Sequence, residues 1–138
     1  MSEAIRYFNN AKEILNKAKI EDNRYSDIKY VQEACGTAYL AVLKAINEYL
    51  LKKVVLKKEL PRSVEAYRKA LQKYLIIYNG KLLKEFDDLY HELHIAGYYA
   101  GDLRHVDTVK TIFKATKVFI DKVKLVAGDK ICRINQIS

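Results

Sequence analysis

The three histidines of the chain, His91, His94 and His105, fall within one fifteen-residue window. On a helix, spacings of four and three residues place Asp87, His91 and His94 on one face. Two imidazoles and a carboxylate can ligate a divalent transition metal, but one helix supplies only part of a coordination shell. The alternative is a polar helix face beside the core. Because the sequence contains no second copy of the pattern, we expect no metal and no other cofactor.

Other chemical signatures are missing from the sequence. It has no glycine-rich phosphate loop, no dinucleotide-binding fingerprint and no Gly-x-Ser-x-Gly nucleophile elbow. The segment from Tyr90 to His94 places its histidines three residues apart, whereas a zinc protease needs four. The common hydrolases and nucleotide-dependent enzymes are therefore unexpected.

Charge is distributed unevenly along the chain. Residues 52–84 hold ten basic and two acidic side chains, and their net charge of +8 equals the formal net charge of all 138 residues. Residues 85–105 are predominantly acidic. The basic block consists of Lys52, Lys53, Lys57, Lys58, Arg62, Arg68, Lys69, Lys73, Lys81 and Lys84.

Three tyrosines, Tyr67, Tyr74 and Tyr78, are interleaved with this basic block. Single-stranded nucleic acids are held by cations along the phosphate backbone and by aromatic rings that stack on exposed bases. The block therefore predicts contact with RNA. The alternative is a solvated lysine-rich face, because its first lysines also suit the end of a long helix.

Apolar residues recur at steps of three and four along almost the whole chain, which predicts an all-α fold. We expect helices over residues 2–19, 26–53, 62–100 and 102–128. Ser26 is the expected N-cap of the second helix, and Asp102 or Asp107 that of the last, which stops at Gly128. The polar segment 20–25 turns the chain, and since no segment alternates like a strand, we expect no sheet. Short connections predict an antiparallel up-and-down four-helix bundle.

Two details of this bundle follow from single residue types. Asn79-Gly80 favours a break, so residues 62–100 form either one kinked helix or two. The second helix carries a seam of small residues that we expect at the centre of the bundle, namely Ala34, Ala38, Ala41 and Ala45.

The length of the chain suits one domain, which we place at residues 1–128, followed by a tail at 129–138. Cys35 and Cys132 form no Cys-x-x-Cys pair and are expected to be reduced thiols. No run approaches the roughly 18 apolar residues of a membrane span, and the first residues do not resemble a secretion signal. We therefore expect a soluble, cytoplasmic protein that does not contact membranes.

The order of the helices, the segment Ala34-Cys35-Gly36-Thr37-Ala38-Tyr39 and the start of the last helix resemble the HEPN superfamily of bacterial four-helix bundles. Residues 30–40 are similar, more narrowly, to a small bacterial family of unknown function. Many HEPN members are dimeric ribonucleases with an arginine, a polar residue and a later histidine near the start of the last helix. Arg104 and His105 match the opening of that motif.

The closing histidine of the motif is replaced here, because Val109, Lys110 and Thr111 occupy its places. The chain therefore lacks the imidazole expected to transfer a proton at the ribose 2′-hydroxyl. The resemblance implies the fold more than the activity. We expect a non-enzymatic module that binds its own copy or a protein partner, with RNA contact as an accessory. The alternative is a divergent, metal-independent ribonuclease of toxin–antitoxin type that uses Arg104 and His105.

Overall fold

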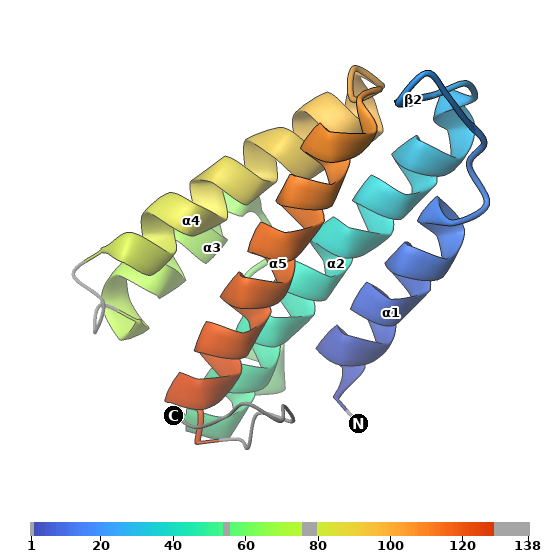
Figure 1. The fold of residues 1–138 in the computed structure, drawn as a ribbon. Helices are drawn as coiled ribbons and strands as arrows, with labels where there is room; N and C mark the ends of the chain where they lie inside the picture. Colours follow the sequence, from blue (N-terminus) through green and yellow to red (C-terminus); the bar gives the residue numbers. More distant parts are fainter. Residues whose placement is uncertain (1, 54–55, 76–79, 129–138) are drawn as a thin grey trace.

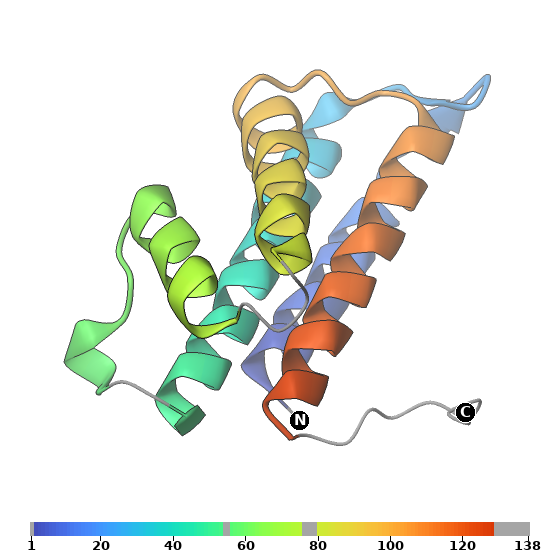
Figure 2. The same ribbon diagram turned by 90° about the vertical axis from the view of Figure 1, so that its left-hand side faces the viewer.

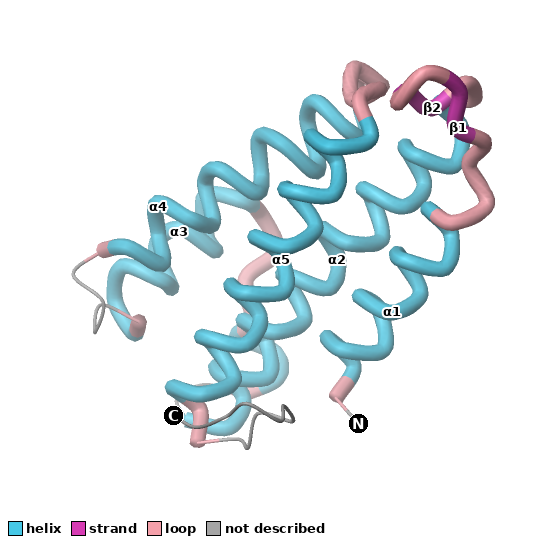
Figure 3. The backbone as a smooth tube through the Cα atoms, viewed as in Figure 1, coloured by secondary structure: helices cyan, strands magenta, loops and turns pink. Residues whose placement is uncertain are grey.

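The computed structural model describes residues 2–53, 56–75 and 80–128, which fold into an all-α bundle (Figures 1 and 3). In chain order its elements are α1 (Glu3–Leu15), β1 (Ile20–Glu21), β2 (Arg24–Tyr25), α2 (Ile28–Lys53), the short 3-10 helix η1 (Lys57–Glu59), α3 (Val64–Tyr74), α4 (Lys81–Leu89), the π-helix η3 (Tyr90–Tyr99) and α5 (Val106–Val126). The expected tail at 129–138, with Cys132, and the residues Tyr78 and Asn79 lie outside the described residues.

The long helices run alternately up and down, in the order α1, α2, α4 continued by η3, and α5 (Figure 1). This confirms the predicted bundle. The shorter helix α3 lies outside these four, beside α4 (Figure 2). None of the helices in the described ranges combines the length and the apolar character that a membrane crossing requires.

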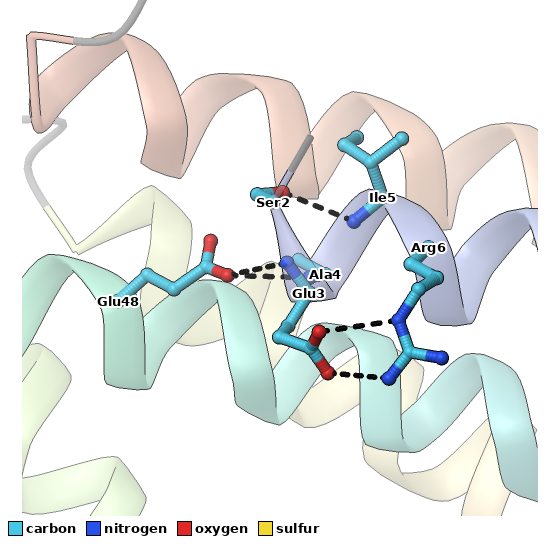
Figure 4. Close-up of polar contacts among 6 residues, drawn as sticks. All are labelled: Ser2, Glu3, Ala4, Ile5, Arg6 and Glu48. Carbon is cyan, nitrogen blue, oxygen red and sulfur yellow. Dashed lines mark hydrogen bonds and ion pairs between the residues drawn. The ribbon is translucent and has the colours of Figure 1, made fainter.

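The N-terminus of α1 is capped from two directions (Figure 4). Within α1, Ser2 Oγ accepts a hydrogen bond from the backbone N–H of Ile5 at 3.2 Å. From α2, Glu48 Oε2 accepts from the backbone N–H groups of Glu3 at 2.9 Å and Ala4 at 3.3 Å. The first amide groups of a helix lack partners and carry partial positive charge. The carboxylate of Glu48 therefore satisfies these amides and ties α1 to α2.

The substitution Glu48→Ala is expected to lower the free energy of unfolding by about 1–2 kcal/mol, because it leaves two helix-end amides without their acceptor. Urea unfolding followed by circular dichroism measures the change. Glu13→Ala removes an exposed carboxylate elsewhere on α1 and should stay within about 0.5 kcal/mol of the wild type. Equal effects of the two substitutions would contradict the capping role of Glu48.

A small hairpin joins α1 to α2, which confirms the predicted turn but corrects the expectation that the chain has no strand. β1 and β2 pair antiparallel over two residues each. At the tip, Asp22 (φ 52°) and Asn23 (φ 63°) adopt the left-handed conformation, which these two residue types tolerate in hairpin turns. Strands of two residues are too short to show an alternating pattern.

The N-cap of α2 lies one residue later than predicted. The backbone N–H of Lys29 donates to Asp27 Oδ1 at 3.0 Å, and α2 begins at Ile28. Ser26 faces the hairpin instead, since its hydroxyl and its backbone N–H both donate to the carbonyl of Lys19. The aspartate side chain therefore caps the helix, while the serine closes the base of the hairpin.

The alanine seam of α2 lies at the centre of the bundle, as predicted. Its members Ala34, Ala38, Ala41 and Ala45 are all buried. Small side chains let neighbouring helices approach closely, and α2 packs against α1, η3 and α5. The largest fully buried side chains, among them Phe86 from α4, complete the core around this seam.

The expected helix over residues 62–100 is two separate helices. α3 ends at Tyr74, and α4 begins after Gly80, whose φ of 78° favours glycine. α4 then continues directly into the π-helix η3, in which backbone bonds span five residues, as from the Ala100 N–H to the Ile95 carbonyl at 2.8 Å. η3 ends at Tyr99 and Gly101 follows with φ 66°, close to the predicted helix end at residue 100. Gly97 lies inside η3.

The start of the last helix differs from the sequence prediction. His105 occupies the N-cap position of α5 without a side-chain hydrogen bond, so neither Asp102 nor Asp107 caps it. Asp107 lies in the first turn, where its negative charge favours the helix end. The predicted stop is confirmed, because α5 ends at Val126 and Gly128 follows with φ 89°.

Candidate functional site

The two residues that resemble a ribonuclease motif stand at the tip of the bundle. The carbonyl of Arg104 accepts a hydrogen bond from the Tyr25 N–H at 2.8 Å, and the Val106 N–H donates to the carbonyl of Asn23 at 3.1 Å. The hairpin therefore fixes the backbone around Arg104 and His105. Both side chains are exposed, and neither pairs with a carboxylate or an imidazole in the part of the chain that the structure describes.

The metal candidates Asp87, His91 and His94 do not converge. Asp87 Oδ1 accepts a hydrogen bond from Arg68 Nε at 2.5 Å, and His91 Nδ1 lies 2.8 Å from the backbone carbonyl of Asp87. The sequence prediction assumed α-helical spacing, but a turn of η3 contains more residues, so the two histidines lie farther apart around the axis. Among the described residues, no group of three or more His, Cys, Asp or Glu could hold a metal ion.

Two members of the basic block, Arg68 and Lys84, form ion pairs with carboxylates of the chain. Arg68 pairs with Glu65 at 3.1 Å as well as with Asp87. Lys84 Nζ lies 3.2 Å from a carboxylate oxygen of Asp88. Arg68 thus joins α3 to α4, and its guanidinium is already engaged by two carboxylates.

The tyrosines of the basic block differ in exposure, and sequence could not show this. Tyr67 is buried, and its hydroxyl donates to Asn47 Oδ1 at 2.9 Å, so its ring cannot stack on a base. Tyr74 is half-buried, and its carbonyl accepts from the Tyr49 hydroxyl at 3.1 Å. Tyr78 lies outside the described residues. Lys69 and Lys73 of α3 are exposed, and Lys73 Nζ lies 5.1 Å from the centroid of the Tyr74 ring.

The described surface carries an apolar groove of about 640 Å³ between α1, α2 and η3. Side chains from all three elements line it, including Ile14, Gly36, Thr37, Leu40, Leu43 and Tyr98. Leu40 is 46% exposed and Tyr98 is 48% exposed, and the neighbouring Tyr99 is 78% exposed. Adjacent exposed apolar side chains of this kind commonly mark an interaction surface.

A ladder of aromatic rings forms the η3 wall of this groove. The ring of His94 stacks on Tyr90 at 5.6 Å and on Tyr98 at 5.9 Å between centroids, with interplanar angles of 26° and 18°. Steps of four residues lie close to one π-helical turn, which brings these rings into line. Tyr39 of α2 lies 4.9 Å from His94, and burial raises the pKa of the Tyr39 phenol, which stays neutral.

Tyr98 is held in place by two contacts with α2. Its ring lies over Gly36, where a Cβ atom would come within 2.8 Å of Tyr98 Cδ1. Its carbonyl accepts a hydrogen bond from Gln32 Nε2 at 3.0 Å. These contacts fix the wall of the groove before any partner arrives, which reduces the entropy lost on binding.

The sequence alone did not join the groove tyrosines to α2. Gly36 and Thr37 lie inside residues 30–40, the segment that is similar to a small bacterial family. That similarity is the one feature of the sequence that pointed to this part of the groove. Their relation to Tyr98 depends on the π-helical register of η3, and helical periodicity at 3.6 residues per turn does not predict that register.

Proteins of solved structure share this fold. A protein of unknown function from Dyadobacter fermentans is 36% identical to the chain, with a TM-score of 0.74, over 90% of this chain and 93% of that chain. A protein from Sulfolobus solfataricus is similar in fold, with 18% identity and a TM-score of 0.71 over 94% of this chain and 98% of that one. None of the curated proteins matches the chain. The model of DUF5618, a domain of unknown function, matches residues 1–125, and the chain belongs to this family.

Proposed function

We propose that this protein is a self-association module that forms a two-fold dimer through the groove between α1, α2 and η3. The observation that carries the proposal is the exposed apolar surface around Leu40 on a pre-formed wall. A monomer leaves this surface in water, and its burial against a second copy is favourable at roughly 25 cal/mol per Å² of apolar area.

The pattern along α2 suits a two-fold partner. Glu33, Thr37, Leu40 and Lys44 follow one another at steps of four, three and four, so they share one face of the helix. When two antiparallel copies of α2 meet about the midpoint of this set, Thr37 faces the partner copy of Leu40. Glu33 likewise faces the partner copy of Lys44. The same patch therefore supplies both signs of charge, which is what an isologous interface requires.

The resemblance to HEPN proteins, many of which are dimers, is consistent with this proposal. We do not extend it to RNA cleavage. Arg104 and His105 lie at the hairpin end of the bundle, and their side chains meet no acid–base partner among the described residues. A binding role uses what the groove offers, namely apolar surface, small residues and flanking charges.

The substitution Leu40→Glu tests the interface at its centre. Two-fold symmetry buries the new carboxylate twice, so we expect association to weaken by about a hundredfold. Sedimentation equilibrium at about 100 µM protein, far above a micromolar dissociation constant, measures the mass. We expect close to twice the 16.0 kDa chain mass for the wild type. For Leu40→Glu we expect a weight-average mass between one and two chains, which falls to that of one chain on dilution to about 1 µM.

Two further variants make this test specific. Leu125→Glu makes the same change at a leucine of α5 that is 55% exposed, and it should leave the dimer intact. Glu33→Lys and Lys44→Glu should each weaken the dimer, and the double exchange should restore it, because each charge meets the other across the two-fold axis. A monomeric wild type, or equal effects of Leu40→Glu and Leu125→Glu, would refute the proposal.

A further inference from the structure

A second groove, of about 400 Å³, lies between α1 and α5, and none of the residues that line it lines the groove of the self-association surface. Its floor is apolar and comes from Phe8 and Leu15 of α1 and Phe113 of α5. The two phenylalanine rings lie 6.0 Å apart between centroids, and both are buried. Both rims are straight, since residues 8–15 of α1 and 110–117 of α5 each span about 10 Å of helix.

Four lysines surround this apolar floor, on both sides of the groove. Lys12 stands on the α1 rim, and Lys110, Lys114 and Lys117 stand on the α5 rim. Lys117 forms an ion pair with Asp121 at 3.0 Å. In the described ranges, no carboxylate pairs with the other three ammonium groups. The stem of Lys12 crosses the Phe8 ring, with Nζ 5.6 Å from its centroid, so its charge is held at the edge of the apolar floor.

We propose that this groove binds an acidic amphipathic helix of a partner protein. Apolar side chains at steps of three and four on that helix would pack onto the floor formed by Phe8, Leu15 and Phe113. Carboxylates on its two flanks would meet Lys12 on the α1 rim and the row of lysines on the α5 rim. This is helix-in-groove recognition, in which the apolar stripe supplies affinity and the flanking charges supply orientation. The open length of about two helical turns fits one short helix.

The distribution of charge distinguishes this occupant from other anions. A fatty acid carries one charge at one end and needs a closed apolar channel, whereas here cations stand along both rims of an open groove. The acidic helix of the chain itself, α4 continued by η3, packs its apolar face into the core and is not free to enter a second copy.

The experiment measures fluorescence anisotropy of a labelled fourteen-residue synthetic peptide with leucines at steps of three and four and glutamates on both flanks. A peptide of the same composition in scrambled order is the control for amphipathicity. We expect the ordered peptide to bind and the scrambled one to bind at least tenfold more weakly, because only the helix aligns leucines with the floor. The protein carries Leu40→Glu in a parallel series, so that the result does not depend on self-association.

The double variant Lys110→Glu/Lys114→Glu should weaken binding of the ordered peptide at least tenfold, since two attractions become repulsions. Lys69→Glu/Lys73→Glu makes the same charge change on exposed lysines of α3 and should leave binding within about twofold. A thermal melt checks that both variants fold. The proposal is overturned by equal losses in the two double variants, by equal binding of the scrambled peptide, or by no binding at about 100 µM. It is also overturned if dodecanoate or single-stranded RNA, but not the peptide, binds in a manner that depends on Lys110 and Lys114.

Discussion

Replacing Phe86 with alanine is expected to lower the free energy of unfolding by about 3–5 kcal/mol. The ring is fully buried, and its centroid lies 6.4 Å from Tyr39 of α2 and 6.2 Å from Tyr67 of α3. It therefore joins three helices, and truncation leaves a cavity that rigid neighbours cannot fill. Against a total stability of roughly 5–15 kcal/mol for a domain, this loss is large.

Urea unfolding of the Phe86 variants, followed by circular dichroism, measures this prediction. Phe86→Leu keeps most of the volume and should cost less than half as much as alanine, because the residual cavity is smaller. Val118→Ala, at a half-exposed position of α5, should stay within about 0.5 kcal/mol of the wild type. A loss below about 1 kcal/mol for Phe86→Ala would mean that the ring does not join the three helices.

The parts of the fold that follow from local periodicity could be predicted from sequence. The long helix through the alanine seam is one example, because a buried stripe sustained over 26 residues specifies both its length and its central place. The break near Gly80 is another, since a left-handed residue interrupts a helix wherever it stands. Both features depend on residues within one segment.

The features that the sequence did not predict depend on backbone register or on distant segments. The hairpin strands hold two residues each, so they carry no periodic signal. The π-helical register of η3 places His91 and His94 farther apart around the helix axis than α-helical spacing predicts, and the sequence carries no periodic signal for that register.

The charged candidate sites also depend on contacts between distant segments, which the sequence does not show. A count along the sequence finds the basic block but not the ion pairs that engage Arg68. It also misses the lysine-rimmed groove, because Lys12 lies far along the chain from Lys110 and Lys114, and only the packing of α1 against α5 joins them. Surfaces assembled from distant helices need tertiary structure before they can be recognised.

A second large loss of stability is expected from Gly97→Ala, at about 2–3 kcal/mol. Gly97 lies against α2, where an added Cβ would stand 2.6 Å from Cys35 Sγ and 2.7 Å from Cys35 Cβ. In an open helix, alanine instead of glycine stabilises by about 0.5–1 kcal/mol. The overlap with a buried residue costs more, typically about 1–3 kcal/mol and occasionally above that. The net effect of Gly97→Ala on the free energy of unfolding is therefore destabilising.

The neighbour at Gly97 cannot move aside, because Cys35 is fully buried. Burial also raises the pKa of its thiol to about 12, so Cys35 packs as a neutral, compact side chain. At Gly36, by contrast, an added Cβ would stand 2.8 Å from Cδ1 of Tyr98, a half-exposed side chain that would have to shift. Gly36→Ala is therefore a control for glycine replacement against a partly exposed neighbour, and it should stay within about 1 kcal/mol of the wild type.

A double-mutant cycle separates this clash from any general intolerance of the π-helix to alanine. Cys35→Gly removes the atoms that the Cβ added by Gly97→Ala would strike. The double variant Cys35→Gly/Gly97→Ala should therefore be more stable than the sum of the single losses by at least about 1 kcal/mol. Additive losses would place the cost in the backbone of η3 itself. A neutral Gly97→Ala, measured by urea unfolding, would show that α2 and η3 can separate without loss. In that case the close contact between Gly97 and Cys35 would not be needed to hold Tyr98 and the other rings of the ladder next to Gly36.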